Sequence, residues 1–184
     1  MSQTLSIAKI QELFDSWREM GSVMLSSGAE LIASYPYGDE TRWMHALFPG
    51  LDTEHLKLLE ADLGQSLPRQ LRAFLRGCGG LTLFQGMFSL YGLRQQGFVA
   101  SDAALQPESL VELNRGMQAV GRLEPGWIAF AQNALDSSIY VTSTDNSISE
   151  VRRIELGKGE VIERHSDIFA CIESRLYRLD EFAM

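Results

Sequence analysis

Hydrophobic residues recur at helical spacing in the middle of the chain, and a change to alternating spacing follows them. Leu56, Leu59 and Leu63 lie three and four positions apart, which places them on one face of a helix. Either Asp52 or Thr53 can cap this helix, because a short side-chain oxygen accepts hydrogen bonds from its first unpaired N–H groups. The pattern therefore predicts an amphipathic helix after residue 52.

A glycine and a proline separate this helix from a second one. Gly64 stands where a left-handed C′ residue is expected, and Pro68 suits a first helical turn, which needs no proline N–H. The apolar face of the second helix consists of Leu67, Leu71, Phe74 and Leu75. Its opposite face consists of Arg69, Arg72 and Arg76. Residues 52–76 are therefore predicted to form a helical hairpin.

Glycines end the second helix, and an extended run follows. We expect Gly77, Gly79 and Gly80 to supply positive φ angles for a sharp reversal of the chain. Residues 81–84 and 87–93 then predict two strands, because apolar side chains alternate along them. The two residues between these runs, glutamine and glycine, suit a hairpin turn.

The remainder of the chain predicts one helix between strands and one helix at the end. The first of these opens at Pro107 and stops near Gly121, and its inward face consists of Leu110, Leu113, Asn114 and Met117. Strands are expected at residues 127–131, 138–143, 151–156 and 160–164. Ser166 is the expected cap of the last helix, whose inward residues are Ile168, Phe169, Ile172 and Leu176. This order predicts an α+β fold with a mainly antiparallel sheet flanked by helices.

The first 48 residues have a pattern of their own. An amphipathic helix is predicted by the three- and four-residue spacing of Ile7, Ile10, Phe14, Trp17 and Met20. Residues 28–38 indicate a short strand that ends at a proline turn, and residues 42–51 indicate one or two helical turns. We therefore expect residues 1–48 to be an N-terminal helical extension packed on a single domain at residues 49–184.

Charge and composition narrow the classes of partner and compartment. The chain of 184 residues has a net charge of −8, which argues against nonspecific nucleic-acid binding and suits a basic partner. Cys78 and Cys171 lie in different predicted elements, so no disulfide framework is expected. No secretory signal is recognisable, and no run approaches the ~20 apolar residues of a membrane span. We expect a cytoplasmic protein that contacts neither nucleic acid nor membrane directly.

Residue types that carry catalysis or bind metals form no recognisable pattern. His45, His55 and His165 are dispersed without metal-ligand spacing, and we expect them at surface or capping positions. The sequence has no Gly-x-Ser-x-Gly elbow, and its central glycines lack the lysine and hydroxyl residue of a phosphate loop. We therefore predict no metal site, no cofactor and no catalytic residue, and we expect Cys171 to be a small buried apolar residue.

The central stretch resembles the signature of the SUKH superfamily, which includes the Smi/Knr-type domain of yeast cell-wall regulators and many bacterial immunity proteins. The matching positions, expected to be structural, are Glu60, Gly64, Leu67, Pro68, Phe74, Gly79 and Gly80. Cys78 stands where the family usually has asparagine, and Leu71 stands where an aromatic residue is common. The recognisable core covers residues 50–95, and the resemblance extends more loosely to the end of the chain. It implies a SUKH-like single domain.

The resemblance also implies a protein-binding module. Bacterial SUKH proteins are typically immunity proteins that neutralise a cognate toxin, often a nuclease or deaminase domain, by direct contact. The implied partner is a toxin domain encoded nearby, and the oligomeric state is left open. Two alternatives also stay open: a regulatory or scaffold protein without a toxin partner, and a small enzyme. Such an enzyme would use Cys78, or carboxylates such as Asp136 and Glu150.

Acidic residues concentrate where such a partner could bind. Residues 101–150 hold seven carboxylates and two arginines, whereas residues 65–100 hold four arginines and no acid. A nuclease domain is positively charged where it holds phosphate, so an acidic surface would complement it. The expected partner-binding residues are Asp102, Glu108, Glu112, Asp136, Asp145 and Glu150.

Overall fold

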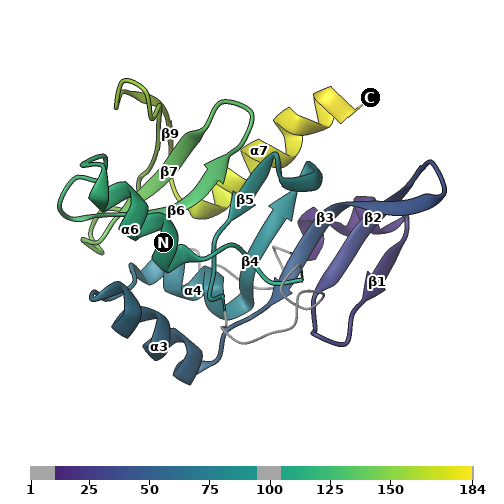
Figure 1. The fold of residues 1–184 in the computed structure, drawn as a ribbon, viewed down its shortest axis with the longest axis horizontal. Coiled ribbons are helices and arrows are strands. Elements are labelled where there is room, and N and C mark those ends of the chain that lie inside the picture. The colour runs from purple at the N-terminus through teal and green to yellow at the C-terminus, as the bar shows by residue number, and fades with distance from the viewer. Residues whose placement is uncertain (1–10, 95–104, 184) are drawn as a thin grey trace.

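The computed structural model of the protein describes residues 11–94 and 105–183. Within these residues, nine strands form one sheet in which each strand pairs antiparallel with the next strand in the sequence. The strands are β1 (Ser22–Met24), β2 (Glu30–Tyr37), β3 (Glu40–Pro49), β4 (Cys78–Leu83), β5 (Phe88–Leu90), β6 (Trp127–Asn133), β7 (Ser138–Ser143), β8 (Val151–Ile154) and β9 (Val161–His165). Figure 1 shows the sheet running from β1 at the right to β9 at the upper left.

Helices lie on both faces of this sheet, which confirms the predicted α+β fold. They are α2 (Asp15–Arg18), α3 (Thr53–Leu63), α4 (Arg69–Gly77), the short 3-10 helix η1 (Phe84–Gly86), α6 (Leu110–Ala119) and α7 (Ile168–Ala183). In Figure 1, α7 crosses behind β5, and α6 lies beside β6. The larger core joins α4 and α7 to one face of the strands, and a smaller cluster joins α6 to the other face of β6, β7 and β8.

The predicted helical hairpin is present and is held together by one carboxylate. Asp52 caps α3 by accepting a hydrogen bond from the His55 N–H at 2.8 Å. Glu60 lies near the end of α3, where its Oε1 atom accepts bonds from the Leu67 N–H at 2.9 Å and from Arg72 Nη1. Burial raises the pKa of Glu60, but these two bonds outweigh burial and leave the pKa below its usual value. Glu60 therefore fixes the break between the two helices.

The predicted role of the glycines after α4 is wrong in part. Gly77 is the last residue of α4, and of the three glycines only Gly80 has a positive φ angle, at 146°. A Cβ atom at Gly79 would collide with the backbone carbonyl of Pro49, and one at Gly80 would collide with the side chain of Pro107. Gly79 and Gly80 therefore allow neighbouring segments to approach β4 closely instead of reversing the chain.

The N-terminal predictions need two corrections. Of the residues 42–51 that were expected to form helical turns, 42–49 belong instead to strand β3, because Trp43, His45 and Leu47 alternate with the side chains between them. The strand predicted at residues 28–38 exists, but Pro36 lies inside β2 opposite Thr41. The expected domain boundary at residue 48 falls within β3, and the division into extension and domain stays a prediction.

The two ends of the chain follow the predicted patterns more closely. Phe14 and Trp17 join the main core, while the positions before residue 11 lie outside the described residues. The four predicted inward residues of α7 are buried, but Asp167, and not Ser166, provides the cap. The Asp167 Oδ1 atom accepts a hydrogen bond from the Ala170 N–H at 2.8 Å.

Candidate functional site

One row of side chains crosses the sheet and is left partly uncovered. Cross-strand partners align Ala46 on β3, Thr82 on β4, Ser89 on β5 and Gln132 on β6, so the four side chains lie on one face. The next partner in the row is Ile139 on β7, which is covered because it packs in the same cluster as α6. The first four positions line an open cleft of about 460 Å³.

A bulge in β6 places Gln132 in this cleft. The register of β6 against β7 shifts between Ala129 and Ala131, so Phe130 joins the main core and Gln132 emerges on the opposite face. Buried Asn114 of α6 holds the bulge, because it accepts from the Ala129 N–H at 3.0 Å and donates to the Ala129 carbonyl at 2.8 Å. The amide of Asn114 thereby replaces a neighbouring strand at this point.

The two ends of the cleft are closed by different segments. Gln85 and Gly86 of η1 lie at one end, and Tyr91, Gln106 and Glu108 lie at the other. The backbone fixes the second wall, since the Gly92 N–H donates to the Glu108 carbonyl at 2.8 Å and the Leu110 N–H donates to the Gly92 carbonyl at 2.9 Å. Gly92 also allows this segment to lie close to β4, because a Cβ atom there would collide with the backbone of Gly79.

The floor of the cleft carries polar groups with bonding capacity to spare. The Tyr91 hydroxyl donates to Gln132 Oε1 at 2.7 Å, and within the described chain the Gln132 amide nitrogen has no hydrogen-bond partner. The hydroxyls of Thr82 and Ser89 likewise make no hydrogen bond to another described residue. Hydroxyl and amide groups both donate and accept, so this floor can bind a partner's N–H and C=O groups.

Glu108 is the only charged side chain among the described residues that line the cleft. Its side chain is 58% exposed, and one of its two carboxylate oxygens lies 3.5 Å from Arg94 Nη1. Burial and, second, the negative charge of Glu108 raise the pKa of the Tyr91 phenol. Glu108 therefore brings a negative charge near Tyr91, with Arg94 as its partner.

The structure separates the acidic residues that the sequence grouped together. Glu108 lines the cleft, and Glu112 follows one turn later on α6, where it pairs with Arg115 at 3.1 Å. Asp136 pairs with Arg153, whereas Glu150 pairs with Arg152 and Arg164. Asp145 accepts from the Ser147 N–H within the connection from β7 to β8. Asp136 and Glu150 lie near opposite ends of β7, and Asp102 is outside the described residues.

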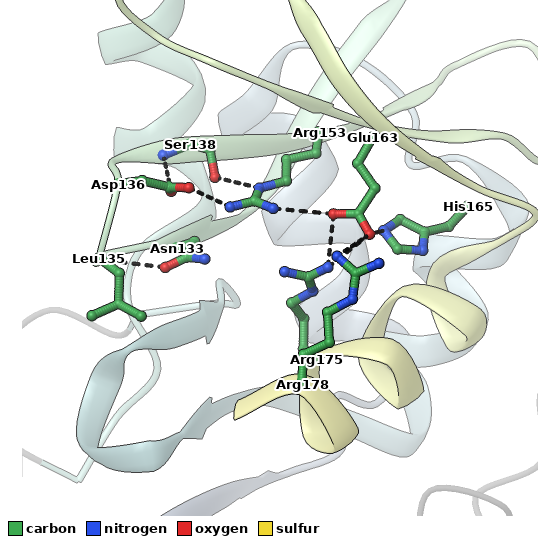
Figure 2. A network of polar contacts seen from close by, with 9 residues as sticks. All are labelled: Asn133, Leu135, Asp136, Ser138, Arg153, Glu163, His165, Arg175 and Arg178. Carbon is green, nitrogen blue, oxygen red and sulfur yellow. Dashed lines mark hydrogen bonds and ion pairs between the residues drawn. The ribbon is translucent and has the colours of Figure 1, made fainter. Parts of the chain in front are cut away.

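A second polar cluster lies on the other face of the sheet and is shown in Figure 2. Glu163 of β9 accepts from Arg153 of β8 at 3.1 Å and from Arg175 of α7 at 2.7 and 2.8 Å. Arg178 and His165 lie 3.0 and 3.6 Å from the same carboxylate. Burial raises the pKa of Glu163, but the cations, Arg175 first, outweigh burial and lower it. This cluster ties α7 to the sheet.

The side chains considered for catalysis do not form a catalytic arrangement. Burial raises the pKa of the Cys78 thiol to about 11, and its sulfur faces the Gly80 carbonyl at 3.0 Å. Cys171 is fully buried, as predicted. His45 was expected near the surface but lies in the core between Phe14, Trp17 and Phe84, where burial lowers its pKa to about 4.

The other histidines and the metal-binding residue types give no site either. His55 contacts the Asp52 carboxylate at 2.8 Å beside the α3 cap, as predicted for a capping histidine, but His165 is largely buried beside Glu163. In residues 11–94 and 105–183, no group of three or more potential metal ligands is found. A buried thiol with a raised pKa and separated carboxylates give no support to the enzyme alternative.

Sequence reasoning missed most of the cleft. It identified Glu108 by charge, but Thr82, Ser89 and Gln132 carry no distinctive motif. Their alternation with buried neighbours in the strands was the available signal, since it points them away from the core. The register that aligns them across three strands is set by the bulge in β6 and by loop geometry, which the pattern does not reveal.

Comparison with known proteins gives one family match. The model of the SMI1 / KNR4 family (SUKH-1) matches residues 50–173, more than half of the chain. The match begins just after β3 and includes every residue of the helical hairpin and every described residue that lines the cleft except Ala46 and Phe48. No curated protein matches the chain. Across the described residues, no helix combines the length and apolar character needed to cross a membrane.

Proposed function

Because the chain belongs to the SMI1 / KNR4 family (SUKH-1), which is known for immunity-type binding domains and is generally non-enzymatic, we propose that it is an immunity protein. It neutralises a cognate toxin, of the nuclease or deaminase type, by direct binding in the cytoplasm. The observation that carries this proposal is the open cleft on the sheet, where the Thr82 and Ser89 hydroxyls and the Gln132 amide nitrogen, which have no partner among the described residues, lie in the same cleft as the exposed side chain of Glu108.

The acidic contacts of this proposal begin with Glu108 and Glu112. Both side chains are more than half exposed; Glu108 lines the cleft just before α6, and Glu112 lies in the first turn of α6. Asp136 and Glu150 are already neutralised by arginines of the same chain, so their contribution is limited to long-range attraction. Asp145 is assigned the same steering role because it is exposed on a distant turn. Asp102 remains a proposed contact on sequence grounds.

The product of the adjacent open reading frame is the partner to test. Co-expression with this chain should restore growth of cells that the product alone inhibits, and the two purified proteins should bind. Glu108→Lys and Glu112→Lys should each slow association and reduce its salt dependence, because rim charges act chiefly on the association rate. Asp62→Lys makes the same change of charge at an exposed position of α3 and is the matched control.

Two outcomes would count against the proposal at different levels. If Glu108→Lys, Glu112→Lys and Asp62→Lys all bind at the rate of the unmodified chain, the acidic contacts are wrong. If the adjacent product neither binds nor is neutralised, the immunity function is wrong. A regulatory or scaffold role without a toxin partner would then be the better account.

A further inference from the structure

The geometry points to a specific occupant of the cleft: we propose that it binds an extended segment of the partner protein that carries an arginine or lysine. The backbone of this segment meets the Thr82, Ser89 and Gln132 side chains, and its cationic head reaches Glu108. This inference rests on the proposed function, because it specifies how the same cleft recognises its partner. Three features of the cleft support it.

The first feature is the size of the floor. Four neighbouring strands contribute one side chain each, and strands are spaced ~4.8 Å apart, so the row spans about 14 Å. An extended chain advances ~3.3 Å per residue, so about four residues cross the row. The cleft volume of about 460 Å³ lies within the range of sites that hold a ligand of limited size.

The second feature is the chemistry of the floor. Ala46, Thr82 and Ser89 are small, which lets a main chain approach the sheet closely. Thr82, Ser89 and the Gln132 amide offer donors and acceptors that no described residue uses. An extended segment has unpaired N–H and C=O groups that need such partners, whereas a helix satisfies them internally. The floor therefore favours an extended backbone over a helix.

The third feature is charge complementarity at one end. Glu108 is the sole charged lining residue in the described chain, and one of its oxygens is not engaged by Arg94. The Arg94 contact is long and exposed on both sides, so it adds little stability and leaves room for a second cation. Glu163 shows that a carboxylate of this fold accommodates several arginines at once. A basic side chain of the partner fits this position.

Selection from a phage-displayed library of random seven-residue peptides tests this inference on the intact chain. Ser89→Arg serves as the decoy, because the long side chain would fill the cleft from an outward-facing strand position, and its fold is checked by circular dichroism. Peptides that also bind Ser89→Arg are discarded. The remaining peptides, which bind only the unmodified chain, should carry arginine or lysine. Glu108→Gln should weaken them about tenfold or more, because a charge-assisted hydrogen bond is lost. Asp62→Asn is the control and should leave binding unchanged.

The outcomes separate this inference from the proposed function. Recovery of no decoy-sensitive peptide, or of peptides without a basic residue, would overturn the cleft assignment. So would neutralisation of the adjacent gene product by Ser89→Arg at the level of the unmodified chain, although the immunity function would then stand. Peptides that need Glu108, combined with no binding to the adjacent product, would support the cleft and reject the toxin partner.

Discussion

At the scale of single residues, Glu163 is the carboxylate with the most basic side chains around it among the described residues. Its carboxylate is 15% exposed and faces Arg175, which is 4% exposed, and Arg153, which is 13% exposed. Removing the Glu163 charge leaves buried Arg175 without a counter-charge, whereas Arg153 keeps Asp136, and an unpaired buried cation is costly even where the intact pair adds little. This cluster could not be predicted from the sequence, because its members lie on three separate elements.

Glu163→Gln should therefore lower the free energy of unfolding by about 3–5 kcal/mol in chemical denaturation. Arg178→Gln is the matched control, since Arg178 contacts the same carboxylate but is 59% exposed, and it should cost less than about 1 kcal/mol. Equal effects of the two substitutions would show that the buried arginines do not depend on Glu163.

His45 should make stability depend on pH in a defined window. Burial among three aromatic rings lowers its pKa in the folded state from 6.5 to about 4. The unfolded chain therefore binds a proton first as pH falls, and stability is lost between pH 6.5 and about pH 4. At pH 5 the loss amounts to about 2 kcal/mol relative to pH 7.

Denaturation of the unmodified chain and of His45→Phe at both pH values measures this contribution. The free energy of unfolding of the unmodified chain, relative to that of His45→Phe, should be lower at pH 5 than at pH 7, because the variant keeps an aromatic ring without a titrating group. Titration of the His45 ring protons by NMR gives an independent value. A midpoint near 6.5 would mean that the ring is solvated in the folded protein.

At the scale of elements, α4 depends on its apolar face. Phe74 is fully buried in the main core, which also contains residues of α3, α7 and the sheet, and Phe74→Ala should cost about 3–5 kcal/mol in the free energy of unfolding. Arg76→Ala, on the exposed side of the same helix, should change it by less than about 0.5 kcal/mol. A loss under about 1 kcal/mol for Phe74→Ala would place the ring outside the rigid core.

Element types could be predicted from the sequence where caps and periodicity agreed. Asp52, Gly64 and the leucines between them specified α3 in full. Prediction failed at residues 42–51, because Trp43, Met44, Leu47 and Phe48 fit both a short helix and a strand buried on both faces. Pairing with β2 and β4 makes this segment a strand, and a single sequence does not show which strands pair.

The candidate site was less predictable than the fold for a related reason. Glu108 could be chosen by charge, but the cleft exists because α6 covers the sheet only from β6 onward. Asn114 and the β6 bulge set that limit, and the sequence showed Asn114 only as one residue on the inner face of a helix. The acidic composition also suggested too many partner-binding residues, since Asp136 and Glu150 form ion pairs with arginines of their own chain.

At the scale of the whole molecule, a continuous antiparallel sheet presents one largely covered face and one partly open face. The strands of residues 22–49 extend the same sheet beyond the segment that the family model matches. That residues 1–48 form an N-terminal extension packed on the domain stays a prediction. The open face combines uncharged polar side chains with one negative charge, that of Glu108, among the described residues that line the cleft.

The central claim is that a protein partner binds at this open face. The most direct measurement is an NMR titration of the isotope-labelled chain with the product of the adjacent open reading frame. We expect the largest changes in amide chemical shift at Thr82, Ser89 and Gln132, with smaller changes at Glu108. Saturable binding with changes confined to α3, α4 or α7, and none at the cleft, would contradict the account.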